Sequence, residues 1–193
     1  TREEYEGFIG YMYVLLAGKY KEYNLVMQLH LCVKRNNNET LLKNVGPDVG
    51  GDSAGNALDV EALGRLLNEM EKADGLPRTI VYTLSPINYY GISTVIGSFR
   101  NVVLGAAWWF CDHKRGIEEQ INIFAETSNL AMFYGMLSDS RSFLSYTRHD
   151  FFRRILANVL GTWVEKGLYA SVELAKGLAR RISYGNVKGV IGD

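Results

Sequence analysis

Residues 135–149 read GMLSDSRSFLSYTRH and join two different kinds of local sequence. An apolar run of strand length, Phe133 to Leu137, changes abruptly into a polar turn that holds Asp139 and Arg141 two residues apart. A strongly helical segment starts beyond Thr147. Catalytic groups of α/β folds gather where strands end, so this carboxylate and guanidinium form a candidate site. The alternative is an ion pair that only ties the loop to the helix.

The rest of the chain alternates short apolar runs with segments of helical periodicity. Alternation of this kind indicates an α/β fold with parallel strands and right-handed crossovers, here in a single domain over residues 1–193. The strands are expected at 25–33, 79–84, 101–110 and 133–137. The helices are expected at 3–20, 58–72, 89–99, 116–129, 147–166 and 171–184.

The first expected strand has a clear period of two. Met27, Leu29 and Leu31 share one face, while Gln28 and His30 share the other. The apolar face should meet the surrounding helices, which places His30 on the opposite face near the carboxyl end of the strand. A lone histidine in a strand is more often structural than a ligand.

Two of the expected helices carry specific sequence signals. Residues 3–20 place Tyr5, Phe8, Ile9, Met12, Leu15 and Leu16 at helical spacing and so predict an amphipathic helix. Thr147 and Asp150 resemble a capping box, with His149 in the cap region rather than at a ligand position. Gly167 is expected to end that helix.

Composition excludes several classes of partner. The 21 basic and 21 acidic residues leave no net charge, so nothing attracts nucleic acid or an anionic membrane. The apolar run at 8–17 is about half of what a bilayer requires. The glycines of the polar segment 34–56 lack the spacing and lysine of a nucleotide-binding motif, so no nucleotide cofactor is expected. Two cysteines, Cys32 and Cys111, form no disulfide framework and favour a reducing, cytoplasmic location.

Several short blocks of the chain are specific sequence motifs. They are MQLH at 27–30 followed by RNNN at 35–38, GPD at 46–48, WWF at 108–110, and DSRSFLSYTRH at 139–149 followed by an aromatic pair and RRIL. In this order and spacing they closely resemble the uronate (glucuronate) isomerase family of the amidohydrolase superfamily. The resemblance covers only the carboxyl-terminal part of that family's chain.

The resemblance implies the C-terminal half of a (β/α)₈ TIM barrel, with about four parallel strands, their helices and terminal helices. These would be strands five to eight, so the family's His-x-His pair on strand one lies outside these residues. Half a barrel exposes sheet edges, so self-association into a homo-oligomer is expected. Two routes stay open: pairing of the first strand with the last strand of another copy, or contact through Tyr5 to Leu16.

The same resemblance implies an aldose–ketose isomerase of hexuronates. It would interconvert D-glucuronate with D-fructuronate and D-galacturonate with D-tagaturonate through an enediol, in glucuronate catabolism. Carried over by position, Asp139 and Arg141 are catalytic and Arg35 and Trp108 bind substrate. His30 and Asp139 would ligate one divalent metal such as zinc. A non-catalytic scaffold and a metal-dependent hydrolase of the superfamily are the alternatives.

Overall fold

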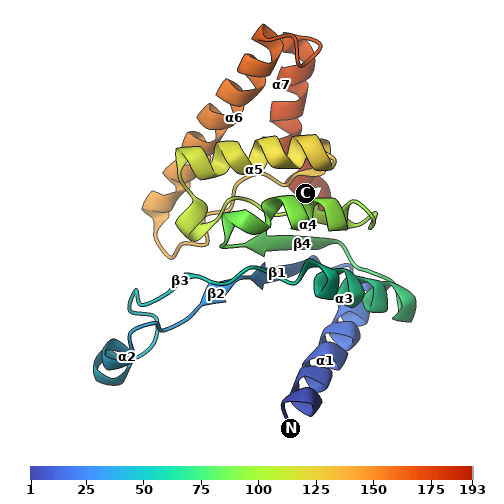
Figure 1. The fold of residues 1–193 in the computed structure, drawn as a ribbon. Coiled ribbons are helices and arrows are strands. Elements are labelled where there is room, and N and C mark those ends of the chain that lie inside the picture. Colours follow the sequence, from blue (N-terminus) through green and yellow to red (C-terminus); the bar gives the residue numbers. More distant parts are fainter. Residues whose placement is uncertain (193) are drawn as a thin grey trace.

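A computed structural model describes residues 1–192, and a three-stranded parallel sheet lies at its centre (Figure 1). The strand order is β1 (Met27–Leu31), β4 (Thr79–Thr83) and β5 (Val102–Leu104). Met27 lies opposite Thr79, and Thr79 lies opposite Val102. The parallel arrangement predicted from the alternation of strands and helices is confirmed.

The six expected helices are present with boundaries shifted by a few residues, and α2 and α8 are additional to them. The helices are α1 (Arg2–Glu22), α2 (Glu39–Val45), α3 (Val60–Ala73), α4 (Tyr89–Ile96), α5 (Lys114–Thr127), α6 (Thr147–Glu165), α7 (Val172–Arg180) and α8 (Asn186–Ile191). The segment 34–56 contains α2 and a small antiparallel ribbon of β2 (Val33–Lys34) and β3 (Ser53–Ala54), which form an arm in Figure 1. Within residues 1–192 no helix combines the length and apolar character needed to cross a bilayer.

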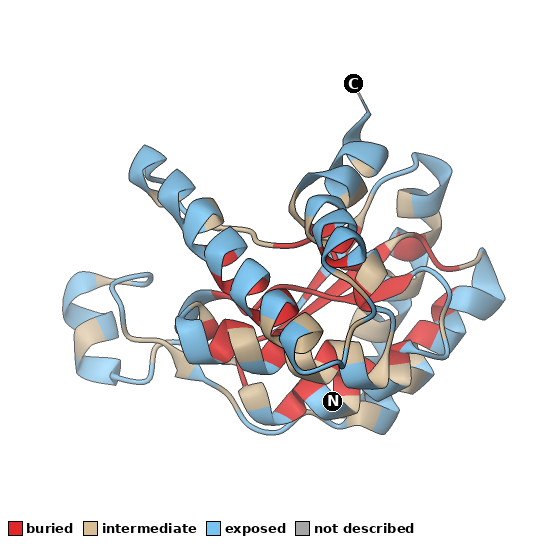
Figure 2. Ribbon diagram, turned by 90° about the horizontal axis from the view of Figure 1, so that it is seen from above, coloured by how far each residue is buried: buried red, intermediate tan, exposed pale blue. Residues whose placement is uncertain are grey.

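The two faces of the sheet differ as the period of two in β1 predicts. Met27 and Leu29 are buried beneath helices, whereas Gln28 and His30 are exposed on the other face. Figure 2 shows the buried residues concentrated in the middle of the molecule, with exposed arms at its periphery. The open face therefore presents His30 near the carboxyl end of β1.

The expected fourth strand at Phe133 to Leu137 is wrong, because this stretch pairs with no strand among the described residues. Phe133 is fully buried and packs edge-to-face on Phe124 and Phe152, at centroid distances of 5.8 and 6.1 Å. The side-chain amide of Asn186 donates to the Phe133 carbonyl at 2.7 Å. Side-chain packing and this amide thus hold the stretch where strand hydrogen bonds were expected.

The amphipathic prediction for the first helix is also wrong. Apolar residues lie nearly evenly around α1, and Ala17 is its one buried residue. The side chains of Tyr5, Phe8 and Tyr11 are 66%, 58% and 64% exposed. Figure 1 shows α1 extending from one side of the sheet, while the α6–α7 hairpin lies at the opposite end. Much of α1 consequently has no neighbour to cover it.

The start of α6 differs from the capping box expected at Thr147. Thr147 is the first helical residue, and its hydroxyl donates to the Leu144 carbonyl at 2.8 Å. Asp150 instead accepts from Arg154 one turn later, at 2.8 Å. The reason is the short 3₁₀ turn Phe143–Tyr146, which feeds directly into the helix and supplies the first carbonyls.

The carboxyl-terminal helix continues beyond its expected end. A π-helical turn, Arg181–Gly185, joins α7 to α8 and carries the helix to Ile191. At the other end of the hairpin, Gly167 has a left-handed φ of 70°, which agrees with its expected role in ending α6.

Candidate active site

A cavity of about 730 Å³ opens at the carboxyl ends of the strands. Three loops line it: the one after β1, the one after β5, and the turn after the Phe133–Leu137 stretch. Besides two serines of that turn, its lining residues are Arg35, Trp108, Trp109, Asp139, Arg141 and Arg148. Four of the predicted site residues therefore meet in one place, as the strand-end argument requires.

The carboxylate of Asp139 is held by Trp108. The indole Nε1–H donates to Oδ2 at 3.1 Å, and Trp108 itself is only 5% exposed. Asp139 also has a φ of 43°, in the left-handed region that non-glycine residues seldom occupy. Strain of this kind persists where the surroundings hold it in place, and it is common at functional sites.

His30 lies behind this pair, in contact with aromatic rings. Its ring centroid is 4.5 Å from Trp108 and 5.0 Å from Tyr82, the latter edge-on. Partial burial lowers the pKa of His30 below its usual 6.5, while the charge of Asp139 acts in the opposite direction. The imidazole is accordingly held neutral, which is the form that binds metals.

Tyr82 belongs to this group although the sequence did not single it out. It is 4% exposed, lies opposite His30 in the parallel register, and donates to Gln28 Oε1 at 2.9 Å. Burial, with a smaller effect of Asp139, raises the pKa of Tyr82 and keeps the phenol neutral. A Cβ at Gly105 would lie 2.2 Å from the Tyr82 ring, so glycine at this position allows Tyr82 to pack closely.

Arg35 reaches the cavity from the arm after β1. It forms ion pairs with Asp48 and with Asp52, the latter at 3.3 Å from Nε. The Asp52 side chain is 5% exposed and also accepts from the backbone N–H of Asn36 at 2.9 Å. Two acidic residues of the same arm therefore fix this guanidinium.

Arg148 and Arg141 differ in how they are held. Arg148, in the first turn of α6, pairs with Asp112, whose side chain is 3% exposed. Burial raises the pKa of Asp112, and the neighbouring Arg148 and His113 oppose this rise. Arg141 is exposed and makes no hydrogen bond or ion pair within residues 1–192. Sequence reasoning missed Arg148 as a site residue, although it stands in the same block as Asp139.

The two tryptophans, Trp108 and Trp109, both line the cavity. Trp109 has a φ of 53° and begins a 3₁₀ turn, Trp109–Cys111, so strand alternation has already ended there. Trp109 is 38% exposed and stacks on Phe110 at 5.0 Å. The turn, rather than the strand, sets its direction.

The metal-ligand types in the described chain do not form a complete site. Within residues 1–192, His, Cys, Asp and Glu form no group of three that could hold a metal. His30 and Asp139 fit a zinc site in donor type, but catalytic zinc sites use three protein ligands. Cys111 and His113 are two residues apart in the chain and have separate partners. The Cys111 thiol donates to Leu84 O at 3.4 Å, and His113 Nδ1 accepts from Gly116 N–H at 3.2 Å.

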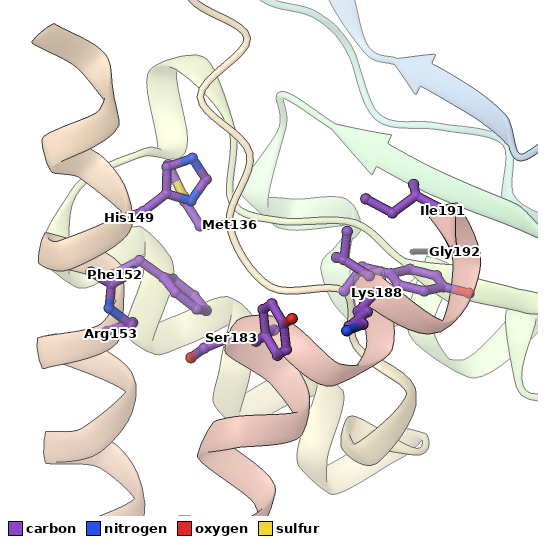
Figure 3. A pocket seen from close by; sticks show the side chains of 11 residues that line it. Met136, His149, Phe152, Arg153, Ser183, Lys188, Ile191 and Gly192 are labelled. Carbon is purple, nitrogen blue, oxygen red and sulfur yellow. The ribbon is translucent and has the colours of Figure 1, made fainter. Parts of the chain in front are cut away.

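His149 lines a second cavity, of about 510 Å³, on the other side of the turn (Figure 3). It lies in the first turn of α6, as the cap-region expectation implied. The figure shows His149 beside Met136, with Phe152 on the same helix and Ile191 across the cavity on α8. Arg148 and His149 are sequence neighbours that face different cavities.

Comparison with known proteins identifies relatives of the whole chain. Residues 1–190 match the profile of the family described as "Glucuronate isomerase". The uronate isomerase of Brachyspira hyodysenteriae is 49% identical over 86% of this chain and 36% of its own length. That of Caldanaerobacter subterraneus subsp. tengcongensis is 45% identical over 100% of this chain and 43% of its own length.

Solved structures give the same result. The uronate isomerase of Thermotoga maritima superposes with a TM-score of 0.92 at 36% identity, covering 100% of this chain and 42% of its own. The glucuronate isomerase of Caulobacter crescentus superposes at 0.83 with 29% identity, covering 93% and 37%. The chain thus spans less than half the length of these relatives.

Proposed function

The chain belongs to the glucuronate isomerase family, and from this membership we propose that it carries one side of the active site of a uronate isomerase. The reaction interconverts an aldose and a ketose hexuronate, D-glucuronate with D-fructuronate or D-galacturonate with D-tagaturonate. A proton moves between C2 and C1 through an enediol. The relatives named uronate isomerase favour this function over a hydrolase or a scaffold.

The observation that carries the proposal is the hydrogen bond from Trp108 to Asp139 inside a cavity lined by arginines. Trp108 occupies Oδ2 of the carboxylate, and Oδ1 accepts no hydrogen bond within residues 1–192. Oδ1 is therefore positioned to take the proton from C2 and return it at C1. Positioned acid–base groups of this kind accelerate proton transfer by about 10²–10⁴-fold.

The cationic side chains supply the remaining requirements. The substrate carboxylate and the developing enediolate oxygen are anions, and guanidinium groups bind such oxygens with two parallel hydrogen bonds. Arg141 is exposed in the cavity and so is available for this role. Trp108 orients Asp139 through its indole N–H, and the indole is itself almost fully buried.

A divalent metal such as zinc, when bound, supplies a Lewis acid that polarises the substrate carbonyl. His30 and Asp139 are the residues of this chain that would hold it, and the remaining ligands would come from other parts of a complete protein. We also place the protein in the cytoplasm. A sequence with two cysteines and no disulfide framework is typical of a reducing compartment.

The test is a chimaera in which this chain replaces the part of the Thermotoga maritima uronate isomerase that it matches. The unaltered chimaera should isomerise glucuronate or galacturonate. Asp139→Asn should lower turnover at least about 10²-fold, because it removes the positioned base. Asp150→Asn is the matched control, since Asp150 is 53% exposed and pairs with Arg154 on the surface of α6. Near-normal turnover by Asp139→Asn would exclude the proposed role.

A further inference from the structure

The three arginines of the cavity differ in the net charge of the groups around them. Arg35 is paired with two carboxylates, those of Asp48 and Asp52, so its surroundings are negative overall. Arg141 has no acidic partner within residues 1–192. An anionic ligand is repelled by the acidic pair beside Arg35. It is attracted instead to Arg141, which also lines the cavity.

Arg148 lines the same cavity as Arg141, and an ion pair fixes its position. Its Nη1 pairs with Asp112, which is 3% exposed, so the guanidinium helps to compensate the charge of a nearly buried carboxylate. The Arg148 side chain is nevertheless 45% exposed and lines the cavity. A guanidinium has five N–H donors in a planar fork, so the donors that do not face Asp112 remain for a ligand.

The Asp112–Arg148 pair also connects the two loops that carry the proposed catalytic groups. Asp112 follows the turn that begins with Trp109, and Arg148 follows the turn that holds Asp139 and Arg141. The Trp108–Asp139 hydrogen bond joins the same two loops. A ligand held by Arg148 is consequently held in a constant position relative to Asp139.

We propose that Arg148 binds the carboxylate of the hexuronate, together with Arg141, and that Asp112 is the positioning residue that orients it. This rests on the proposed function. Arg35, by contrast, organises the arm after β1 through its two acidic partners and does not bind the substrate carboxylate. The site thereby selects sugars with a charged C6 group over their neutral counterparts.

The experiment compares glucuronate with glucuronamide, which differs only in an uncharged amide at C6. Calorimetry measures the binding of both to the chimaera, and kinetics measures KM and kcat for glucuronate. Arg148→Gln should raise Kd and KM for glucuronate about 10- to 100-fold, as expected when a charged hydrogen bond is lost. It should leave kcat within about threefold and the Kd of glucuronamide within about twofold.

A second set of variants separates anchoring from folding. Arg148→Lys keeps the charge without the fork and should lie between the parent and Arg148→Gln. Asp112→Asn should raise KM in the same direction, with no further effect in an Arg148→Gln background. Arg154→Gln is the matched control on the same helix, because Arg154 is 79% exposed and pairs only with Asp150. Thermal unfolding verifies that each variant is folded.

The outcomes distinguish this inference from the proposed function. Unchanged glucuronate affinity in folded Arg148→Gln would overturn the anchoring role alone, as would an equal loss of affinity for glucuronate and glucuronamide. Additive effects of the Asp112 and Arg148 variants would overturn the positioning role of Asp112. A parent chimaera that neither binds nor isomerises any hexuronate would remove the proposed function, and this inference with it.

Discussion

Asp139 combines an unusual backbone conformation with a hydrogen bond from the indole of Trp108. Its left-handed φ is shared by Cys32, Asn36, Asp48 and Trp109, all on the loops that follow β1 and β5. Such conformations cost of order 1–3 kcal/mol each and persist only where the structure over-determines them. Asp139 and Trp109 both line the cavity, so two of these strained positions belong to the candidate site.

The electrostatic coupling of His30 to Asp139 can be measured directly. In the folded chain, the NMR titration of the His30 ring should give a pKa below 6.5, because burial among the rings outweighs the charge of Asp139. Asp139→Asn should lower this pKa further, since the raising influence is removed. Asp150→Asn, on the surface of α6, should leave it unchanged. A rise in the His30 pKa upon Asp139→Asn would contradict the arrangement.

This depressed pKa also sets a direction for stability. The unfolded chain binds the His30 proton more readily than the folded chain, so unfolding takes up protons as the pH falls through 6.5. The contribution of His30 to stability is therefore complete above pH 6.5 and is lost as the pH falls toward the folded pKa.

Among the elements, the Phe133–Leu137 stretch departs most from its sequence pattern. A strand requires hydrogen-bonding neighbours, and the described residues provide none here. The stretch is held at its start by the Phe133 ring and at its middle by Gly135, which has a φ of 74° and passes close to the α7–α8 connection. This anchoring positions the turn that carries Asp139.

Gly135→Ala should therefore destabilise the chain. A Cβ at Gly135 would lie 2.5 Å from the Ile182 carbonyl oxygen, and the left-handed φ adds strain. The expected loss is about 1–3 kcal/mol in urea unfolding. Gly161→Ala is the control, because Gly161 lies in α6 with nothing within 4 Å of its added Cβ. There a gain of up to about 1 kcal/mol is expected from helix propensity. Equal effects of the two substitutions would argue against the anchoring.

At the scale of the molecule, the isolated 193-residue chain should not isomerise uronates and should bind zinc weakly. The reason is that His30 and Asp139 are two donors, whereas catalytic zinc sites use three. A coupled assay and zinc titration of the purified chain measure both. The chimaera described above is the positive control. Clear turnover by the isolated chain would show that the inventory of site residues is incomplete.

The isolated chain should also self-associate, because α1 exposes several aromatic side chains and β1 is an edge strand. Light scattering after gel filtration should report a dimer or larger species at micromolar concentration. Phe8→Glu should restore the monomer if α1 forms the contact, and should have no effect if the strands do. Tyr90→Glu is the control on α4, where Tyr90 is 61% exposed. A parent chain that remains a monomer of 21.7 kDa would exclude both routes.

The sequence by itself determined the parallel α/β class, the order of the elements and the face on which His30 lies. These follow from periodicity, which is a local property of β1 and the helices. It also predicted that the block at 139–149 marks the site, because that motif is specific. The convergence of Arg35, Trp108, Asp139 and Arg141 on one cavity agrees with that expectation.

Only the tertiary structure decided the features that depend on contacts between distant residues. The loss of a strand at Phe133 to Leu137 depends on the neighbours available for hydrogen bonding, which no local pattern encodes. The pairing of Arg148 with Asp112, 36 residues apart, arises because two loops meet at one end of the sheet. The direction of Trp109 depends on a left-handed turn that overrides strand alternation. Periodicity reports which face a residue occupies, whereas its partners are set by how the elements pack together.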